Sequence, residues 1–315
     1  MAQAKGQLSQ VLIDWESVYN QTPSSPAAVN MPFNSCGVRA QQNMITPMTI
    51  TGRRDSVEPA FGNKDVRGTC VVPVDAIAIG YWWKALLGSP TTSQSAAPYI
   101  HTFKVQDNLP SFLLELGFTD ISQYFKFTGC KADGLSMAIG GDGELVANID
   151  VIGAQETVSG SSFDGSPSTI SFTRFNNFQA TLEEGGSPIT NCTLVNLNVK
   201  TGLDPDSFPI GANGFRTQLL EGQCTVDGSI RVFFEDLTLY NKAKNLTESS
   251  LELVFTSSPN VMTITMPEVK YKLGGPEVPT PGGVYLELAF TAFYNNSSED
   301  SVLQVRLDNG LASYA

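Results

Sequence analysis

The residue types that most often perform catalysis are sparse in this sequence. It contains one histidine, His101, in the alternating segment Tyr99–Val105, so any Ser-His-Asp or Cys-His arrangement would have to use that residue. A metal site with several histidine ligands is impossible within one such chain. We expect His101 to be a strand histidine that faces solvent or an interface, without a catalytic role.

Motifs that bind phosphates, nucleotides or calcium are also missing. The sequence has no GxxxxGK loop and no GxGxxG fingerprint. The acidic segments Asp142–Glu144 and Asp204–Asp206 lack the spacing of an EF-hand and are typical of turns. The pair Glu183–Glu184 lies in a predicted turn, without the aromatic or basic cleft of a glycosidase site. We therefore predict no enzymatic activity, no cofactor and no metal.

The cysteines predict buried packing groups rather than a cross-linked framework. There are five of them, an odd number, and no CxxC pair occurs, which argues against a set of disulfides or a zinc module. We interpret them as small buried hydrophobes of a protein that assembles in a reducing cytoplasm. They are Cys36, Cys70, Cys130, Cys192 and Cys224.

Composition favours a large β-rich protein. The 315 residues are 41% hydrophobic and 16% charged, with 28 glycines and 18 prolines, which suits a folded chain with many turns. The net charge of −12 disfavours a nucleic-acid binder, whose affinity comes from basic contacts with phosphates, but suits a protein that holds DNA at a distance. No apolar run approaches the roughly 20 residues of a membrane helix, and the N-terminus lacks the apolar core of a secretion signal. We expect no membrane contact.

The segment Tyr124–Gly153 predicts a β-hairpin around which the rest is organised. Its first part alternates, Gly140–Gly143 supplies turn residues that tolerate positive φ, and Glu144–Ile152 alternates again. In the returning strand one face is apolar, formed by Leu145, Ala147, Ile149 and Val151. The other face is small, polar and acidic, formed by Glu144, Val146, Asn148 and Asp150.

Further strands and two short helices are predicted on either side of this hairpin. Asp75 is placed to cap a helix over Ala76–Leu87, and a second short helix is expected between Leu237 and Leu246. The remaining predicted strands are Met44–Thr51, Asp65–Val74, Tyr99–Val105, Ser111–Thr119, Thr193–Lys200, Phe215–Val226, Ser229–Phe234, Leu251–Phe255, Val261–Met266, Val269–Leu273 and Val284–Phe293. We expect a polar tail after Asn295.

Several segments of the first half resemble one family of structural proteins. GCKADGLSMAI at Gly129–Ile139 leads into a strand that ends Asp150-Val-Ile-Gly153, and Arg67-Gly68 is followed by VPVDAIAIGYWWKALLG at Val72–Gly88. Together with Asp14–Ser17 and Thr22-Pro23, these segments resemble the tail tube (major tail) proteins of long-tailed, siphophage-type bacteriophages.

The resemblance implies a structural virion protein without catalytic residues. Such a protein self-assembles into stacked rings that form the tail tube, a channel for DNA delivery into the host. It implies assembly in the host cytoplasm, a tape-measure protein and a tail terminator as partners, and viral DNA that crosses the lumen without specific binding. The alternative is a β-sandwich decoration protein or carbohydrate-binding virion module, in which Trp82 and Trp83 would line a ligand groove.

An internal repeat predicts two tandem units. Elements follow in the same order in both halves, and three pairs of segments match. These are Arg67–Cys70 with Glu221–Cys224, Tyr124–Gly129 with Val269–Gly274, and Gly143–Ile152 with Gly283–Phe293. We predict an all-β fold with short flanking helices and two duplicated tail-tube-like β-sandwich units. The predicted divisions are an N-terminal arm (1–30), unit 1 (31–155), an exposed linker (156–173) and unit 2 (174–315).

The resemblance and the repeat together give three expectations about assembly. The apolar residues Leu12, Ile13 and Trp15 of the arm are expected to contact a neighbouring subunit. The polar strand faces are expected to line an acidic lumen that repels DNA. Two units per chain favour a ring of three chains with pseudo-sixfold symmetry; six chains would form a ring if only one unit entered the inner barrel. The candidate lumen residues are Glu144, Asn148, Asp150, Glu287 and Thr291.

Overall fold

The computed structural model describes residues 3–278 and 280–314. As predicted, the fold is all-β with short helices, of which α1 spans Ala78–Leu87 and α2 spans Thr238–Lys244. The strands up to the central hairpin are β1 (Ser9–Trp15), β2 (Val29–Met31), β3 (Ser35–Cys36), β4 (Arg39–Ile45), β5 (Ala60–Pro73), β6 (Thr91–Ser93), β7 (Tyr99–Lys104), β8 (Phe112–Phe118), β9 (Gln123–Ile139) and β10 (Val146–Gly153). Those that follow are β11 (Gln155–Ser159), β12 (Ser168–Thr169), β13 (Ala180–Glu184), β14 (Ser187–Pro188), β15 (Cys192–Lys200), β16 (Thr225–Phe233), β17 (Ser249–Ser257), β18 (Asn260–Tyr271), β19 (Tyr285–Ala292) and β20 (Gln304–Asn309).

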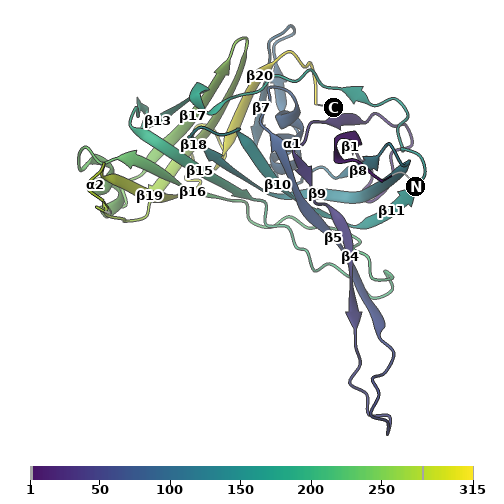
Figure 1. Cartoon of the computed structure of the whole chain (residues 1–315). Coiled ribbons are helices and arrows are strands. Elements are labelled where there is room, and N and C mark those ends of the chain that lie inside the picture. The colour runs from purple at the N-terminus through teal and green to yellow at the C-terminus, as the bar shows by residue number, and fades with distance from the viewer. Residues whose placement is uncertain (1–2, 279, 315) are drawn as a thin grey trace.

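One continuous antiparallel sheet crosses both halves of the chain (Figure 1). Its strands pair in the order β4–β5–β10–β9, then β9–β15, then β15–β16–β19–β18. The joint between the halves is the register from Val195↔Ile139 to Lys200↔Gly134. Because β9 and β15 pair continuously over this register, the two halves share a single surface.

A second layer of strands lies behind this sheet in each half. In the first half it runs β1–β8–β9–β11, and in the second it runs β13–β17–β18–β20. The long strands β9 and β18 each belong to both layers, and β9 turns between them at Gly129, whose φ is +62°. Strand β20 pairs with β7 of the first half, so the second layer also connects the two halves.

The two halves therefore share one pairing order. Across the sheet, the strands of each half stand in the order first, second, fourth, third, counted along the chain. In each half the helix follows the second of these strands in the chain. Of the sequence matches that suggested a repeat, Gly143–Ile152 and Gly283–Phe293 fall at equivalent places, on the fourth strands β10 and β19, whereas Tyr124–Gly129 and Val269–Gly274 do not. Tyr124–Thr128 pairs with β8 and β11, whereas Val269–Tyr271 pairs with β19.

The main core lies around α1. Every residue of this helix is buried, and Trp82 packs edge-on against Phe112 of β8 with ring centroids 6.1 Å apart. The helix begins at Ala78 with Ile77 as its N-cap, so Asp75 is not the N-cap residue that the sequence predicted, but its carboxylate accepts a 3.2 Å hydrogen bond from the Ile79 amide in the first turn. Helix α2 buries only Ala243.

The N-terminal segment differs from the predicted arm. Strand β1 lies between β8 and β2 in its own chain, and Leu12 and Ile13 are 0% and 3% exposed. Trp15 is half-buried and contacts the Phe112 ring edge-on at 6.0 Å. The apolar residues of this segment are accounted for by packing within the chain, because β1 completes a layer that β8 would otherwise leave open.

The segment 156–173 lies on the surface of the first half without being a free linker. It is exposed or half-buried throughout, yet β11 pairs with β9 and β12 pairs with β2. Buried Glu115 accepts hydrogen bonds from Ser162 (2.6 Å) and from the amide of Phe163 (2.9 Å). Its polar residues are thus held by strand pairing and by a buried carboxylate.

Strands β4 and β5 form a long hairpin that leaves the body of the protein (Figure 1). Strand β5 is 14 residues long, and only its second part pairs with β10. The connecting residues 46–59 extend farthest from the rest of the chain. Met48 and Ile50 in this tip are 98% and 96% exposed.

Candidate functional site: the polar face of the sheet

One face of the continuous sheet is apolar and buried, and the other is polar and open. Strict alternation produces this division: Leu286, Leu288 and Phe290 of β19 are buried, while the residues between them are exposed. The same alternation holds in β10 and β15. We define the polar face as the open side of β5, β10, β9, β15, β16 and β19.

Small amides and hydroxyls form a row across this face. Strand register places Asn148 opposite Ser136, Ser136 opposite Asn198, and Asn198 opposite Asp227. The Asn148 amide donates to the Ser136 hydroxyl (3.3 Å), and the Asn198 amide donates to the Asp227 carboxylate (3.1 Å). Because these partners lie on adjacent strands, their hydrogen bonds fix the row as a polar surface without large side chains.

Both acidic and basic side chains lie on the polar face, and one ion pair joins them. Lys200 of β15 donates to Asp150 of β10 at 2.8 Å, and this hydrogen bond raises the pKa of Lys200. The Thr69 hydroxyl also donates to Asp150, at 2.8 Å. Farther along, Arg231 lies opposite Glu287. Asp227 adds an acidic group whose partner is the Asn198 amide, so the face carries charges of both signs and not the acidic residues alone, because Lys200 and Arg231 come from the second half.

Four of the five predicted lumen residues lie on this face. Asn148, Asp150, Glu287 and Thr291 all project from its open side, as their alternation requires. Glu144 precedes β10 and lies at the end of the sheet instead. Its carboxylate pairs with Arg174 (2.8 Å) and accepts from the Asn34 amide (2.8 Å).

His101 lies in the core, not at a surface. It is 0% exposed, and burial lowers the pKa of its imidazole. The Nε2 atom is 2.8 Å from the Leu311 carbonyl, so Nε2–H donates, and Nδ1 then accepts from the Thr92 hydroxyl at 2.8 Å. Nε2 thereby holds the C-terminal segment and Nδ1 holds Thr92 of β6, which accounts for the histidine structurally.

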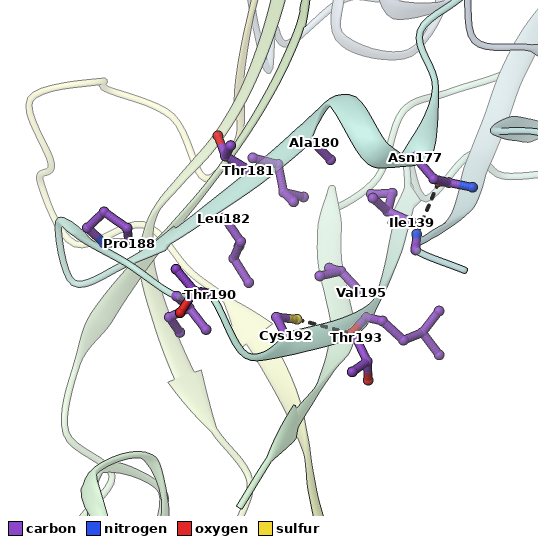
Figure 2. Close-up of a pocket in the computed structure, with 14 residues that line it drawn as sticks. Ile139, Asn177, Ala180, Thr181, Leu182, Pro188, Thr190, Cys192, Thr193 and Val195 are labelled. Carbon is purple, nitrogen blue, oxygen red and sulfur yellow. Dashed lines mark hydrogen bonds between the residues drawn. The ribbon is translucent and has the colours of Figure 1, made fainter. Parts of the chain in front are cut away.

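One cavity, near the joint between the halves, offers no charged or aromatic side chain for catalysis or sugar binding. It has a volume of about 340 Å³ and lies between β13, β15 and the end of β9 (Figure 2). Leu182, Val195 and Ile139 give it an apolar wall, and no aromatic or charged side chain lines it. A carbohydrate site would need an aromatic platform, and Trp82 and Trp83 are buried in α1.

The described ranges 3–278 and 280–314 contain neither a metal-binding cluster nor a helix that could span a membrane. No cluster of three or more histidine, cysteine or acidic residues there could hold a metal ion. Within those ranges, no helix has both the length and the apolar character needed to cross a bilayer.

The sequence did not single out the apolar tip of the β4–β5 hairpin as a functional feature. Met48, Ile50 and Phe61 are 98%, 96% and 82% exposed on this projection. The available signal was a set of large apolar residues in a segment rich in turn residues, where no core could cover them.

Comparison with known proteins identifies one family. The sequence profile described as phage tail tube protein matches residues 6–292, which is most of the chain. No curated protein sequence matches the chain.

Proposed function

The chain belongs to the phage tail tube protein family, and from this premise we propose how its sheet builds the wall of the tube. It is a structural protein of the virion that forms the tail tube. Because the family is structural, we assign the chain no enzymatic activity. The proposal rests on one observation: two halves with the same strand pairing order are joined edge to edge in a single sheet.

The joint within the chain suggests the joint between chains. The first strand of the second half, β15, pairs with the third sheet strand of the first half, β9. At the far end of the sheet, the segment Lys270–Gly275 lies alongside β19. The Lys272 amide donates to the Ala289 carbonyl at 2.8 Å. The other side of this segment is the place for β4 of the next chain, which would repeat the β9–β15 joint and leave no open edge.

This arrangement favours three chains in each ring. Each chain contains two units with the same strand pairing order, so three chains supply six units around a pseudo-sixfold axis. Closure by strand tilt and stagger fixes the number of strands and the diameter together. A ring of six chains would instead require that one half lie outside the inner barrel, although both halves contribute equally to the continuous sheet.

The polar face lines the channel in this arrangement. Asn148, Asp150, Glu287 and Thr291 face the lumen, and Glu144 lies near its rim. Amides, hydroxyls and carboxylates offer phosphates no strong attraction, since non-specific DNA affinity grows with lysine and arginine that contact phosphates, and Lys200 is paired with Asp150. Viral DNA passes without specific binding.

The hairpin β4–β5 joins successive rings. It projects from the sheet and exposes Met48, Ile50 and Phe61, which would be buried against the adjacent ring. Leu12 and Ile13 are not available for such contacts, so any contribution of the N-terminal segment comes from exposed residues such as Val18. A tape-measure protein inside the tube and a terminator at its end complete the siphophage-type tail, which assembles in the host cytoplasm without membrane contact.

A single substitution at the free edge tests ring closure. Lys272 donates toward β19, so the N–H of Leu273 points to the outer side, and Leu273→Pro removes an edge donor without removing an internal hydrogen bond. We expect folded chains that form no tubes in negative-stain microscopy. Leu273→Ala keeps the N–H and should still assemble. Normal tubes from Leu273→Pro would contradict closure at this edge.

A further inference from the structure

Two cysteines at the base of the β4–β5 hairpin have a geometry that tube building does not require. Cys36 of β3 lies directly opposite Cys70 of β5, and their Sγ atoms are 3.0 Å apart. We propose that this pair is a site of oxidative modification, where a Cys36–Cys70 disulfide forms after the assembled tail leaves the reducing host cytoplasm and clamps the hairpin base to the sheet.

The strand register suits such a bond. The Gly37 amide donates to the Thr69 carbonyl at 2.9 Å, which makes Cys36 and Cys70 a non-hydrogen-bonded pair of antiparallel strands. Cα atoms in these pairs are about 4.5 Å apart with the side chains close together. Disulfide-bonded cysteines have Cα separations of about 4.4–6.8 Å. Small side-chain rotations therefore suffice, without rearrangement of the backbone.

The two thiols have different environments, which assigns their roles. Cys36 is half-buried on a two-residue strand, whereas Cys70 is 1% exposed beneath the sheet. The hydrogen bond from the Cys70 thiol lowers the pKa of Cys36, while the same contact and burial raise the pKa of Cys70. Cys36 is thus the thiolate that an outside reagent meets first, and Cys70 is the group that resolves the intermediate.

The oxidant is a small-molecule disulfide, such as oxidised glutathione, in the medium outside the cell. The Cys36 thiolate attacks one sulfur of this reagent, releases one thiolate and remains as a mixed disulfide. Cys70 then loses its proton to solvent and attacks the Cys36 sulfur, which releases the second thiolate. The two cysteines lose two electrons and two protons in total, and the reagent is reduced to two thiols.

The position of the bond determines its consequence. The chain between Cys36 and Cys70 contains all of β4, the exposed tip and the outer part of β5. On its other side Cys70 pairs with Ile149 of β10 in the continuous sheet. A disulfide would therefore tie the short strand β3 to the sheet at the point where the hairpin leaves it, and would close the hairpin into a covalent loop.

The test uses purified full-length chain and tubes, each treated with oxidised glutathione and then with an alkylating reagent. Peptide mapping without reduction should give a Cys36–Cys70 cross-link as the main product, with two fewer alkylated cysteines than in the reduced chain. The oxidised chain should also unfold at a higher temperature. Cys36→Ser should abolish both changes, and Cys224→Ser, the matched control, should alter neither.

The order of attack is tested separately with Cys70→Ala. This variant should accumulate a stable glutathione adduct at Cys36, because the resolving thiol is gone. Two results would overturn the proposal: Cys36 that stays fully alkylatable under conditions that oxidise an exposed dithiol peptide, or a cross-link to Cys130 in place of Cys70.

Discussion

The two halves of the chain pair their strands in the same order but build their interiors differently. All 10 residues of α1 are buried, whereas the 7-residue α2 buries only Ala243. The difference arises because distant segments cover α1. Trp15 of β1 lies beneath the Lys84 ammonium at 4.1 Å, and Tyr314 packs on Tyr81 at 5.0 Å. The same sheet design therefore carries a fully buried helix in one half and a largely exposed or half-buried one in the other.

The contrast between the helices predicts the largest stability difference in the molecule. Trp82→Ala removes a fully buried ring and should lower the free energy of unfolding by about 3–5 kcal/mol. Leu239→Ala in α2, where the side chain is only partly buried, should cost about 1 kcal/mol. Denaturant titration of unassembled chains measures both. Equal losses would show that α2 supports its half as strongly as α1 does.

A buried arginine joins the two halves and predicts the next largest effect. Arg216 is 1% exposed and donates to Asp65 (2.6 Å), the Gly153 carbonyl (3.1 Å) and the Pro205 carbonyl (2.6 Å). Arg216→Met leaves these acceptors without a donor and should cost about 3 kcal/mol. Arg231→Met on the polar face is the exposed control and should cost under about 1 kcal/mol. A loss below that of the control would mean the halves are held by strand pairing alone.

The carboxylates at the starts of the helices predict opposite pH responses. Desolvation raises the pKa of Asp75 to about 6 from 3.8, so its contribution to stability is complete below about pH 4 and is lost as pH rises through 6. Asp75→Asn should therefore gain up to about 3 kcal/mol relative to the wild type between pH 4 and pH 7.

Exposed Asp236 provides the matched comparison at α2. The Thr238 amide donates to it at 2.7 Å and lowers its pKa, so its contribution is present above the unfolded pKa and is lost in acid. Asp236→Asn should approach the wild type as pH falls. Parallel pH profiles for both variants would contradict the assignment of burial as the cause at Asp75.

The smallest expected effect on stability belongs to the polar face. Asp150 and Lys200 come from different halves and are about half exposed, so a double-mutant cycle with Asp150→Asn and Lys200→Met should give a coupling below about 1 kcal/mol. Their larger effect should be on DNA passage, because either single variant leaves an unpaired charge on the face that we propose lines the lumen. Asp150→Asn, which leaves Lys200 unpaired, should slow DNA ejection at low salt more than Lys200→Met, which leaves Asp150 unpaired. No difference between the variants would place these residues outside the channel.

Local patterns in the sequence predicted local structure well. The turn of the central hairpin forms at Gly140 and Gly141 with φ of +124° and +79°, and Asp75 contacts the first turn of α1. Alternation also placed Asn148 and Thr291 on the open face. These features depend on residues close in sequence, where periodicity and turn chemistry carry the information.

Features that depend on distant segments were missed or misplaced. Strand β20 lies in the expected polar tail because it pairs with β7, about 200 residues earlier in the chain. His101 is buried because the same pairing places the following segment, with the Leu311 carbonyl, against its imidazole. The predicted strand Phe215–Val226 is mostly irregular, since Arg216 is anchored to Asp65 and not to a ladder. The Lys200–Asp150 ion pair of the polar face likewise required the β9–β15 joint.

A helical reconstruction of assembled tubes tests the central claim most directly. If both halves form one wall, each ring contains three chains, β4 of one chain pairs with the Lys270–Gly275 edge of the next, and Asn148 and Thr291 face the lumen. A ring of six chains, with β16 and β19 on the outside of the tube, would contradict the account.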